Sequence, residues 1–297
     1  MLELIANFMK SKNELYITTL QVFFFLAANY LLPIVALAQQ AEQEKEANRW
    51  SVAVAINSVE AQMDQKLFDT WIYANANYYS YYGDKKDKSY SISIIPKYKV
   101  SKDLSLRFEF GITNIDLYSY YNGSGDTLSQ GQGHIGATGD FIKEENIKQK
   151  IFRFCLGTQR NIFKAKFIEF YCGASLNYFK YEKMEWSDYI DESPSFQFPE
   201  YKYRIYTATT PGGFAAGIGA LVGMNVYLSK RISLGGEISY SLLYYQLGGV
   251  QSGFLDINQF SSSQYFNSHI PWSIYNNASE GIEFSKVMPS FFISFRL

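Results

Sequence analysis

The sequence predicts an all-β protein: a closed antiparallel up-and-down barrel whose eight strands cross a membrane. Three observations predict this fold. Large apolar residues alternate with small or polar ones, short connections alternate with long ones, and aromatic residues are unusually frequent. Tyr, Phe and Trp make up 18% of the 297 residues, and they favour pleated, half-buried surfaces and membrane–water boundaries.

The N-terminal segment reads as a targeting signal. Lys10 and Lys12 precede an apolar run from Leu15 that ends in Ala36-Leu37-Ala38, the small-x-small pattern of a signal peptidase site. The run is also long enough for an uncleaved membrane anchor, which is the alternative. We therefore divide the chain into a signal peptide (1–38) cleaved after Ala38, a polar periplasmic lead-in (39–48) and a barrel (49–297).

Eight segments show alternation with a period of two. In chain order they lie at 50–57, 90–100, 104–113, 152–157, 168–177, 213–228, 232–242 and 287–297. In the first four segments the large apolar rows include Val52 and Val54, Ile92 and Ile94, Phe108 and Phe110, and Phe152 and Phe154. In the last four they include Ile168 and Phe170, Val222 and Met224, Leu234 and Ile238, and Phe291 and Ile293. Each segment is a predicted strand.

The connections between these strands alternate in length. Two are three-residue turns at 101–103 and 229–231, and a third at 159–165 is slightly longer. The four others are long, at 58–89, 119–147, 179–212 and 248–281. This asymmetry predicts short periplasmic turns and four long extracellular loops.

The second row of each strand decides which face is wet. A soluble barrel would bury its apolar row and show water a row rich in charged residues. Here the second row is small and weakly polar, as in Gly213-x-Ala215-x-Gly217-x-Gly219, which suits the lining of a narrow eight-stranded lumen. The apolar row is nearly free of charges, each of which would cost roughly 2–4 kcal/mol at mid-bilayer if it were Arg or Lys. We therefore expect the apolar row to face lipid.

The predicted lumen row carries a set of charged residues. Buried charges need partners, so we expect a salt-bridge and hydrogen-bond network, joined by Tyr171, that plugs the lumen. A gated pore or proton path is the alternative. The members are Lys97, Lys99, Arg107, Arg153 and Arg296 with Glu109, Glu169 and Glu237.

Over 49–297 the pattern resembles the small eight-stranded outer-membrane β-barrels of Gram-negative bacteria. The resemblance rests on the signal peptide, the alternation, the loop asymmetry and the terminal strand at 289–297. It implies an outer-membrane location, contact with outer-membrane lipids, and recognition of Phe291, Phe295 and Leu297 by the barrel insertion machinery. Family members usually end in an aromatic residue, whereas this chain ends in Leu297.

Clustered tyrosines in the first two long loops are candidate ligand-binding residues. The favoured interpretation is an aromatic girdle at the outer membrane interface, with strands that extend above the membrane. These tyrosines are Tyr78, Tyr79, Tyr81, Tyr82, Tyr118, Tyr120 and Tyr121.

The sequence predicts no catalytic, metal or cofactor site. His134 and His269 are expected in loops without ligand spacing. Cys155 and Cys172 lie on adjacent strands but are predicted to face opposite sides, which predicts free thiols. The 27 Lys and Arg against 28 Asp and Glu give no excess of positive charge for nucleic acid.

The function that follows is a non-enzymatic surface barrel whose long loops contact an unknown extracellular ligand. A passive conduit for small molecules or lipids, and an enzyme that modifies envelope lipids, are the alternatives.

Overall fold

The computed structural model describes residues 49–59, 84–124, 140–192, 201–261, 264–276, 278–285 and 287–297. Within these ranges the chain forms a single 14-stranded sheet in which every pairing is antiparallel. The part of the chain that the structure describes contains no helix with the length and apolarity to cross a membrane. The predicted signal peptide and lead-in lie outside the described residues.

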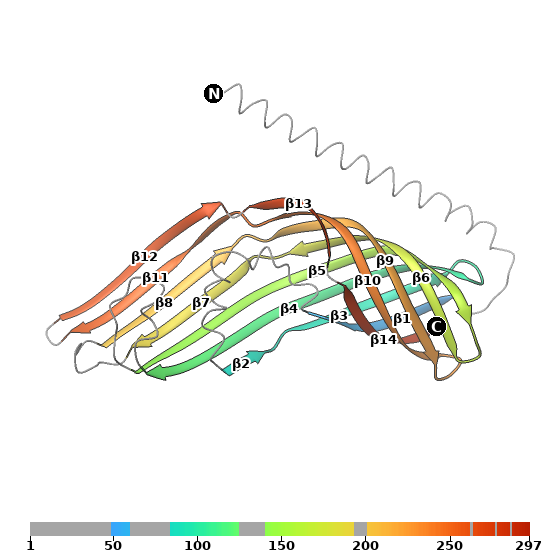
Figure 1. Cartoon of the computed structure of the whole chain (residues 1–297), viewed down its shortest axis with the longest axis horizontal. Helices are drawn as coiled ribbons and strands as arrows, with labels where there is room; N and C mark the ends of the chain where they lie inside the picture. Colours follow the sequence, from blue (N-terminus) through green and yellow to red (C-terminus); the bar gives the residue numbers. More distant parts are fainter. Residues whose placement is uncertain are drawn as a thin grey trace, which may run out of the picture.

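The strands are long and run side by side along the molecule (Figure 1). Their bounds are β1 (Trp50–Asn57), β2 (Asp84–Asp87), β3 (Tyr90–Lys99), β4 (Leu104–Ser124), β5 (Asp140–Lys164), β6 (Ile168–Tyr181), β7 (Met184–Glu192), β8 (Tyr201–Thr210), β9 (Gly213–Tyr227), β10 (Ile232–Leu247), β11 (Val250–Ser261), β12 (Gln264–Asn276), β13 (Ser279–Phe284) and β14 (Met288–Arg296).

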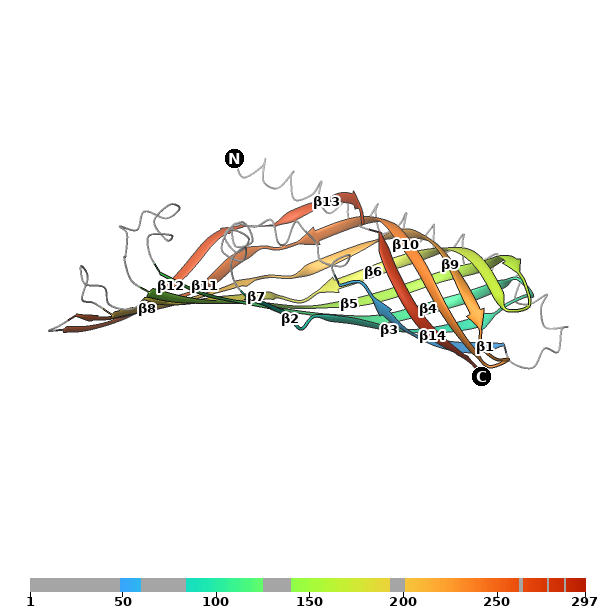
Figure 2. The ribbon, with the colours of Figure 1, turned by 60° about the horizontal axis from the view of Figure 1, so that its bottom comes forward.

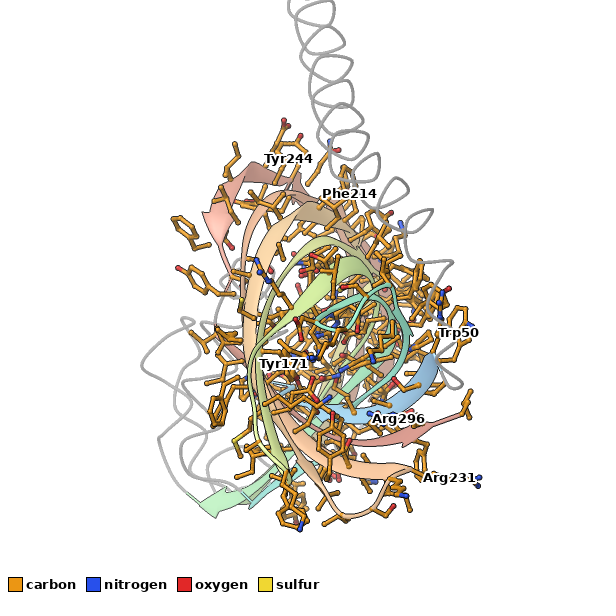
Figure 3. The ribbon with its side chains drawn as sticks, turned by 90° about the vertical axis from the view of Figure 1, so that its right-hand side faces the viewer. Trp50, Tyr171, Phe214, Arg231, Tyr244 and Arg296 are labelled. Carbon is orange, nitrogen blue, oxygen red and sulfur yellow. The ribbon has the colours of Figure 1, made fainter. Side chains whose placement is uncertain are left out.

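Eight strands pair in a series that returns to its starting point. The series runs β1–β3–β4–β5–β6–β9–β10–β14, and β14 pairs with β1. We call these eight strands the strand ring. It occupies one end of the molecule in Figure 2 and is seen from the end that carries the short turns in Figure 3.

The other strands continue the lines of the ring. β7 follows β6 and pairs with the same neighbour, β5, and β11 follows β10 as β8 precedes β9. Backbone hydrogen bonds span the breaks, from Glu182 N to Lys150 O at 2.9 Å and from Gly248 N to Gly212 O at 2.9 Å. Gly248 has a φ of 79°, a conformation that glycine adopts at little cost. The pairings thus follow eight chain lines, several of them broken near the same level.

The long connections are therefore not loops in their described parts. They contain β2, β7, β8, β11, β12 and β13, together with the outer halves of β4 and β5, and this sheet beyond the ring is called the extension. The prediction of the fourth strand at 152–157 was too short, because β5 runs over 25 residues. In its outer half, Ile142 and Ile147 lie on opposite faces among charged and polar residues, so no continuous apolar row marks this part of the strand. The third short turn is also tighter than predicted, spanning 165–167.

The distribution of polar and apolar side chains in the ring is the reverse of that in a water-soluble protein. Large apolar side chains on the outer face are exposed; examples are Phe110 at 53% and Phe291 at 73%. Polar side chains on the inner face are buried, among them Ser93, Thr113, Asn177, Ser241 and Ser290. A globular protein in water buries apolar groups and pairs its few buried polar ones.

Small residues on the inner face make room for large ones across the ring. A Cβ atom at Gly223 would lie 2.4 Å from the hydroxyl of Tyr171, and one at Gly235 would lie 2.3 Å from the ring of Phe292. Both distances are far below van der Waals contact. The small residues of the inner row thus leave the space that the side chains of Tyr171 and Phe292 occupy.

An aromatic row crosses the outer face of five neighbouring lines. Phe110 meets Phe154, with ring centroids 5.8 Å apart, Phe154 meets Tyr178 at 6.3 Å, and Tyr178 meets Phe214 at 6.2 Å. Phe214 then meets Tyr244 at 6.2 Å. In Figure 3, Phe214, Tyr244 and Trp50 lie on the outside of the ring, whereas Tyr171 lies within it.

Candidate functional site

A cluster of four paired charges lies at the centre of the ring. Arg107 on β4 donates across the interior to both carboxylate oxygens of Glu237 on β10, at 2.7 and 2.8 Å. It also donates to Glu109 at 3.1 Å, and Glu109 lies 3.2 Å from Arg153 on β5. All four residues are at most 5% exposed. The two arginines and two glutamates neutralise one another, which is the arrangement that buried ions require.

Neutral and aromatic groups complete this central cluster. The hydroxyl of Tyr171 donates to Glu237 at 3.0 Å, and Nε of Arg153 lies 3.2 Å from the sulfur of Cys155. The ammonium of Lys97 lies 5.3 Å from the ring centre of Tyr171 and 4.8 Å from that of Phe292. A cation over aromatic faces is stabilised by the ring quadrupole, so the structure gives Lys97 aromatic neighbours beside the ion pairs.

An apolar cluster closes the interior on the side of the extension. Its buried members include Ile151, Phe179, Leu243, Tyr245 and Met288. The guanidinium of Arg153 lies 5.8 Å from the ring centre of Phe179, which joins the apolar cluster to the ion cluster. The sequence reading missed this apolar cluster, because its residues sit past the predicted strand ends or in the row taken as small and polar.

The other predicted network residues lie nearer the short turns. Glu169 accepts a hydrogen bond from the hydroxyl of Tyr227, and the guanidinium of Arg296 lies 5.7 Å from the ring centre of Tyr227. Lys99, Glu169 and Arg296 line a cavity of about 760 Å³ that also reaches Lys97. The predicted set of eight charges is thus divided between a central cluster and a mouth.

The candidate tyrosines are only partly within the described residues. Tyr78, Tyr79, Tyr81 and Tyr82 lie outside them. Tyr118, Tyr120 and Tyr121 belong to β4, where they pair with Asn146, Glu144 and Lys143 of β5. Their expected position at the start of a loop was wrong, because β4 continues to Ser124.

The histidines and cysteines can be compared with their predictions in the same way. His134 lies outside the described residues, and His269 belongs to β12 rather than to a loop, paired with Asp256 across the strands. Its ring stacks on Phe254, with centroids 4.6 Å apart. Cys155 and Cys172 are free, as predicted. Among the described residues there is no group of His, Cys, Asp or Glu with the geometry of a metal site.

A second polar cluster lies inside the extension, on the far side of the apolar cluster. Lys143 on β5 lies 3.5 Å from Asp188 on β7, and the indole of Trp186 donates to Glu145 at 2.8 Å. Burial raises the pKa of Asp188 to about 6, although Lys143 opposes the shift. The sequence reading treated this segment as loop and did not identify these residues.

Comparison with known proteins assigns no family to the chain. No family model matches it, and no curated protein matches it. Among solved structures, 84 chains match. The outer membrane protein OprG from Pseudomonas aeruginosa is 8% identical, with a TM-score of 0.35, and the match covers 85% of this chain and 97% of that one.

Two further solved structures are similar to the same extent. A major outer membrane protein from Thermus thermophilus is 12% identical, with a TM-score of 0.34 and coverage of 85% of this chain and 100% of that one. CarO from Acinetobacter baumannii is 6% identical, with a TM-score of 0.32 and coverage of 86% and 100%. The first two of these neighbours are named as outer membrane proteins.

The central ion cluster yields a stability prediction. Arg107→Met leaves the buried carboxylate of Glu237 without its cation and should lower the free energy of unfolding by about 3–5 kcal/mol. Arg107→Met combined with Glu237→Met removes both charges and should cost less than the sum of the two single changes. Urea unfolding followed by tryptophan fluorescence measures all three variants. Additive effects would show that the pair is not coupled.

Asp188 yields a prediction about pH. Its raised pKa means that the folded extension binds the proton more tightly than the unfolded chain, whose aspartate titrates near 3.8. The stability of the extension should therefore fall as pH rises from 3.8 to about 6 and then level off. Asp188→Asn should abolish this fall, whereas Glu185→Gln, on the exposed side of β7, should keep it. Hydrogen exchange of the β7 amides, corrected for intrinsic rates, measures the effect, and an unchanged slope in Asp188→Asn would contradict it.

Proposed function

We propose that this chain is an integral outer-membrane protein, a closed eight-stranded β-barrel that is non-enzymatic and has a plugged polar lumen. The strand ring spans the bilayer, and the extension stands outside the cell as a binding surface for an extracellular ligand. The short turns face the periplasm.

The observation that carries this proposal is the reversed distribution of polarity in the ring. Exposed Phe and Ile side chains cover the outside, while Arg107, Glu109, Arg153 and Glu237 are buried inside. In hydrocarbon every backbone N–H and C=O must be paired within the protein, and a ring of strands in which each has two neighbours achieves this. A protein dissolved in water rarely exposes a continuous belt of large apolar side chains.

The height of the apolar belt matches a bilayer. On the outer face of β5, Phe152, Phe154, Leu156 and Thr158 lie between the exposed charges of Lys150 and Arg160. A tilted transmembrane strand needs about 9–11 residues, which is the length of this stretch. The aromatic row through Phe154, Tyr178 and Phe214 lies on the outer face within this belt.

A structural role for the lumen charges is supported by their mutual pairing. Each of the four central charges has an opposite charge within 3.2 Å, and the apolar cluster covers them on the side of the extension. A pore needs a continuous wet path, and an enzyme needs an acid–base group that a substrate can reach. This packing favours the plug over both alternatives.

The surface and the terminal strand suggest the contacts of the protein. The exposed outer row meets outer-membrane lipids. Phe291, Phe295 and Leu297 are exposed at the C-terminal end of the chain, where we propose that the barrel insertion machinery recognises them before β14 pairs with β1. The extension, with its long paired strands, presents the surface for the extracellular ligand.

The bilayer assignment predicts a contrast between two substitutions. Phe110→Arg puts a charge in the middle of the belt and should lower the free energy of unfolding in phosphatidylcholine vesicles by about 2–4 kcal/mol. Ile270→Arg, at an exposed position of similar size on β12 of the extension, should change it by no more than about 0.5 kcal/mol. Equal effects at the two positions would contradict the proposal that the ring spans the bilayer.

A plugged lumen should not conduct ions. The purified barrel in a planar bilayer should show no steady conductance, since the ion pairs and the apolar cluster fill the interior. Single-channel recording tests this, with a known porin as the positive control. A steady, sizeable conductance would favour the conduit instead.

A further inference from the structure

The cavity at the short-turn mouth is strongly positive. Its lining contains the cations Arg49, Lys97, Lys99, Lys102, Lys164, Lys230, Arg231 and Arg296. Glu169 is the only acid among the described residues that line it, and the hydroxyl of Tyr227 already donates to this carboxylate. Figure 3 shows Arg231 and Arg296 at this end of the ring. Like charges gathered in a concave site raise its potential and concentrate anions there.

These cations come from several different strands and turns. Arg49 precedes β1, Lys97 and Lys99 end β3, and Lys164 ends β5, while Lys230 and Arg231 form the β9–β10 turn. Lys97 is 6% exposed and forms the deepest part of the positive lining, beside the central cluster. Charges scattered over a surface would not gather from separate strands and turns around one cavity. Arg and Lys together provide the charge-assisted hydrogen bonds that hold phosphate.

A second observation concerns neutral groups of the same cavity. The amide oxygens of Gln159 and Asn225 are buried and have no hydrogen-bond partner among the described residues, and both residues line the cavity. They are 4% and 7% exposed. A buried acceptor without a donor is costly, and a phosphate group, which accepts, does not relieve it. These oxygens need hydroxyl or other donors.

We propose that the cavity binds a phosphate ester carried on a hydroxylated carbon chain. The phosphate lies among the Lys and Arg side chains, and the hydroxyl groups donate to Gln159 and Asn225. A free sugar phosphate and the headgroup of phosphatidylglycerol both have this chemistry. The site is separate from the proposed surface role of the extension, and its lipid source rests on the proposed outer-membrane location.

The soluble source is tested by calorimetry with the protein purified from membranes in an uncharged detergent. Fructose 1,6-bisphosphate should bind with one-to-one stoichiometry and more weakly as salt increases. Lys99→Gln and Lys164→Gln should each weaken binding roughly three- to tenfold. Lys166→Gln is the matched control, because Lys166 lies in the turn at 165–167 but does not line the cavity, and it should leave binding unchanged.

The role of the amides is tested with a probe that lacks hydroxyl donors. Gln159→Leu should weaken binding of fructose 1,6-bisphosphate but leave the binding of tripolyphosphate unchanged. Equal losses for both probes would overturn the hydroxyl part of the proposal. Heat-dependent mobility on a gel verifies that each variant is folded.

The lipid source is tested by native mass spectrometry with phosphatidylglycerol and phosphatidylcholine. Retention of phosphatidylglycerol alone, lost in Lys99→Gln and kept in Lys166→Gln, would support the proposal and identify the headgroup as the source. The proposal is overturned if neither fructose 1,6-bisphosphate nor phosphatidylglycerol binds. It is also overturned if Lys166→Gln loses as much binding as Lys99→Gln.

Discussion

The pairing of neighbouring strands around the ring is the constraint on which the other features depend. Side chains alternate along a strand with a period of two, so once each strand has a neighbour on both sides, the two rows become an inside and an outside. Arg107 on β4 can reach Glu237 on β10 only because the intervening strands bend the sheet round on itself. The same pairing leaves the Phe and Ile row no surface to cover except the exterior.

The interior has three levels that share side chains. The cationic mouth meets the central ion cluster at Lys97, and the ion cluster meets the apolar cluster where Arg153 lies against Phe179. Each level limits its neighbour, since the apolar residues cover the ion pairs, and the ion pairs, which are neutral as a group, leave the positive charge of the mouth uncompensated. A change at Glu237 would therefore be felt at Tyr171 and Lys97 as well as at Arg107.

Much of the ring could be predicted from the sequence, because large apolar residues at every second position leave few alternatives. The alternation also assigned Arg107, Glu109 and Glu237 to one face. It could not predict their partners, since those depend on the curvature of the sheet. The extension was missed because the outer half of β5, from Asp140 to Lys150, lacks a continuous apolar row at every second residue. Trp186 and Asp188 were missed for the same reason.

The breaks between the ring and the extension lie near one level, at 88–89, 182–183, 211–212 and 248–249. They form a seam at which each strand line keeps its pairing partners, while the outer row of side chains changes from apolar in the ring to mixed in the extension. Below the seam, a deletion of one residue would turn the outer side chains of that strand inward beyond the deletion. Above it, a hairpin can be shortened, lengthened or exchanged in whole pairs of residues without altering the register beneath. The seam is thus the natural grafting line for foreign segments, and the boundary along which related chains would be free to diverge.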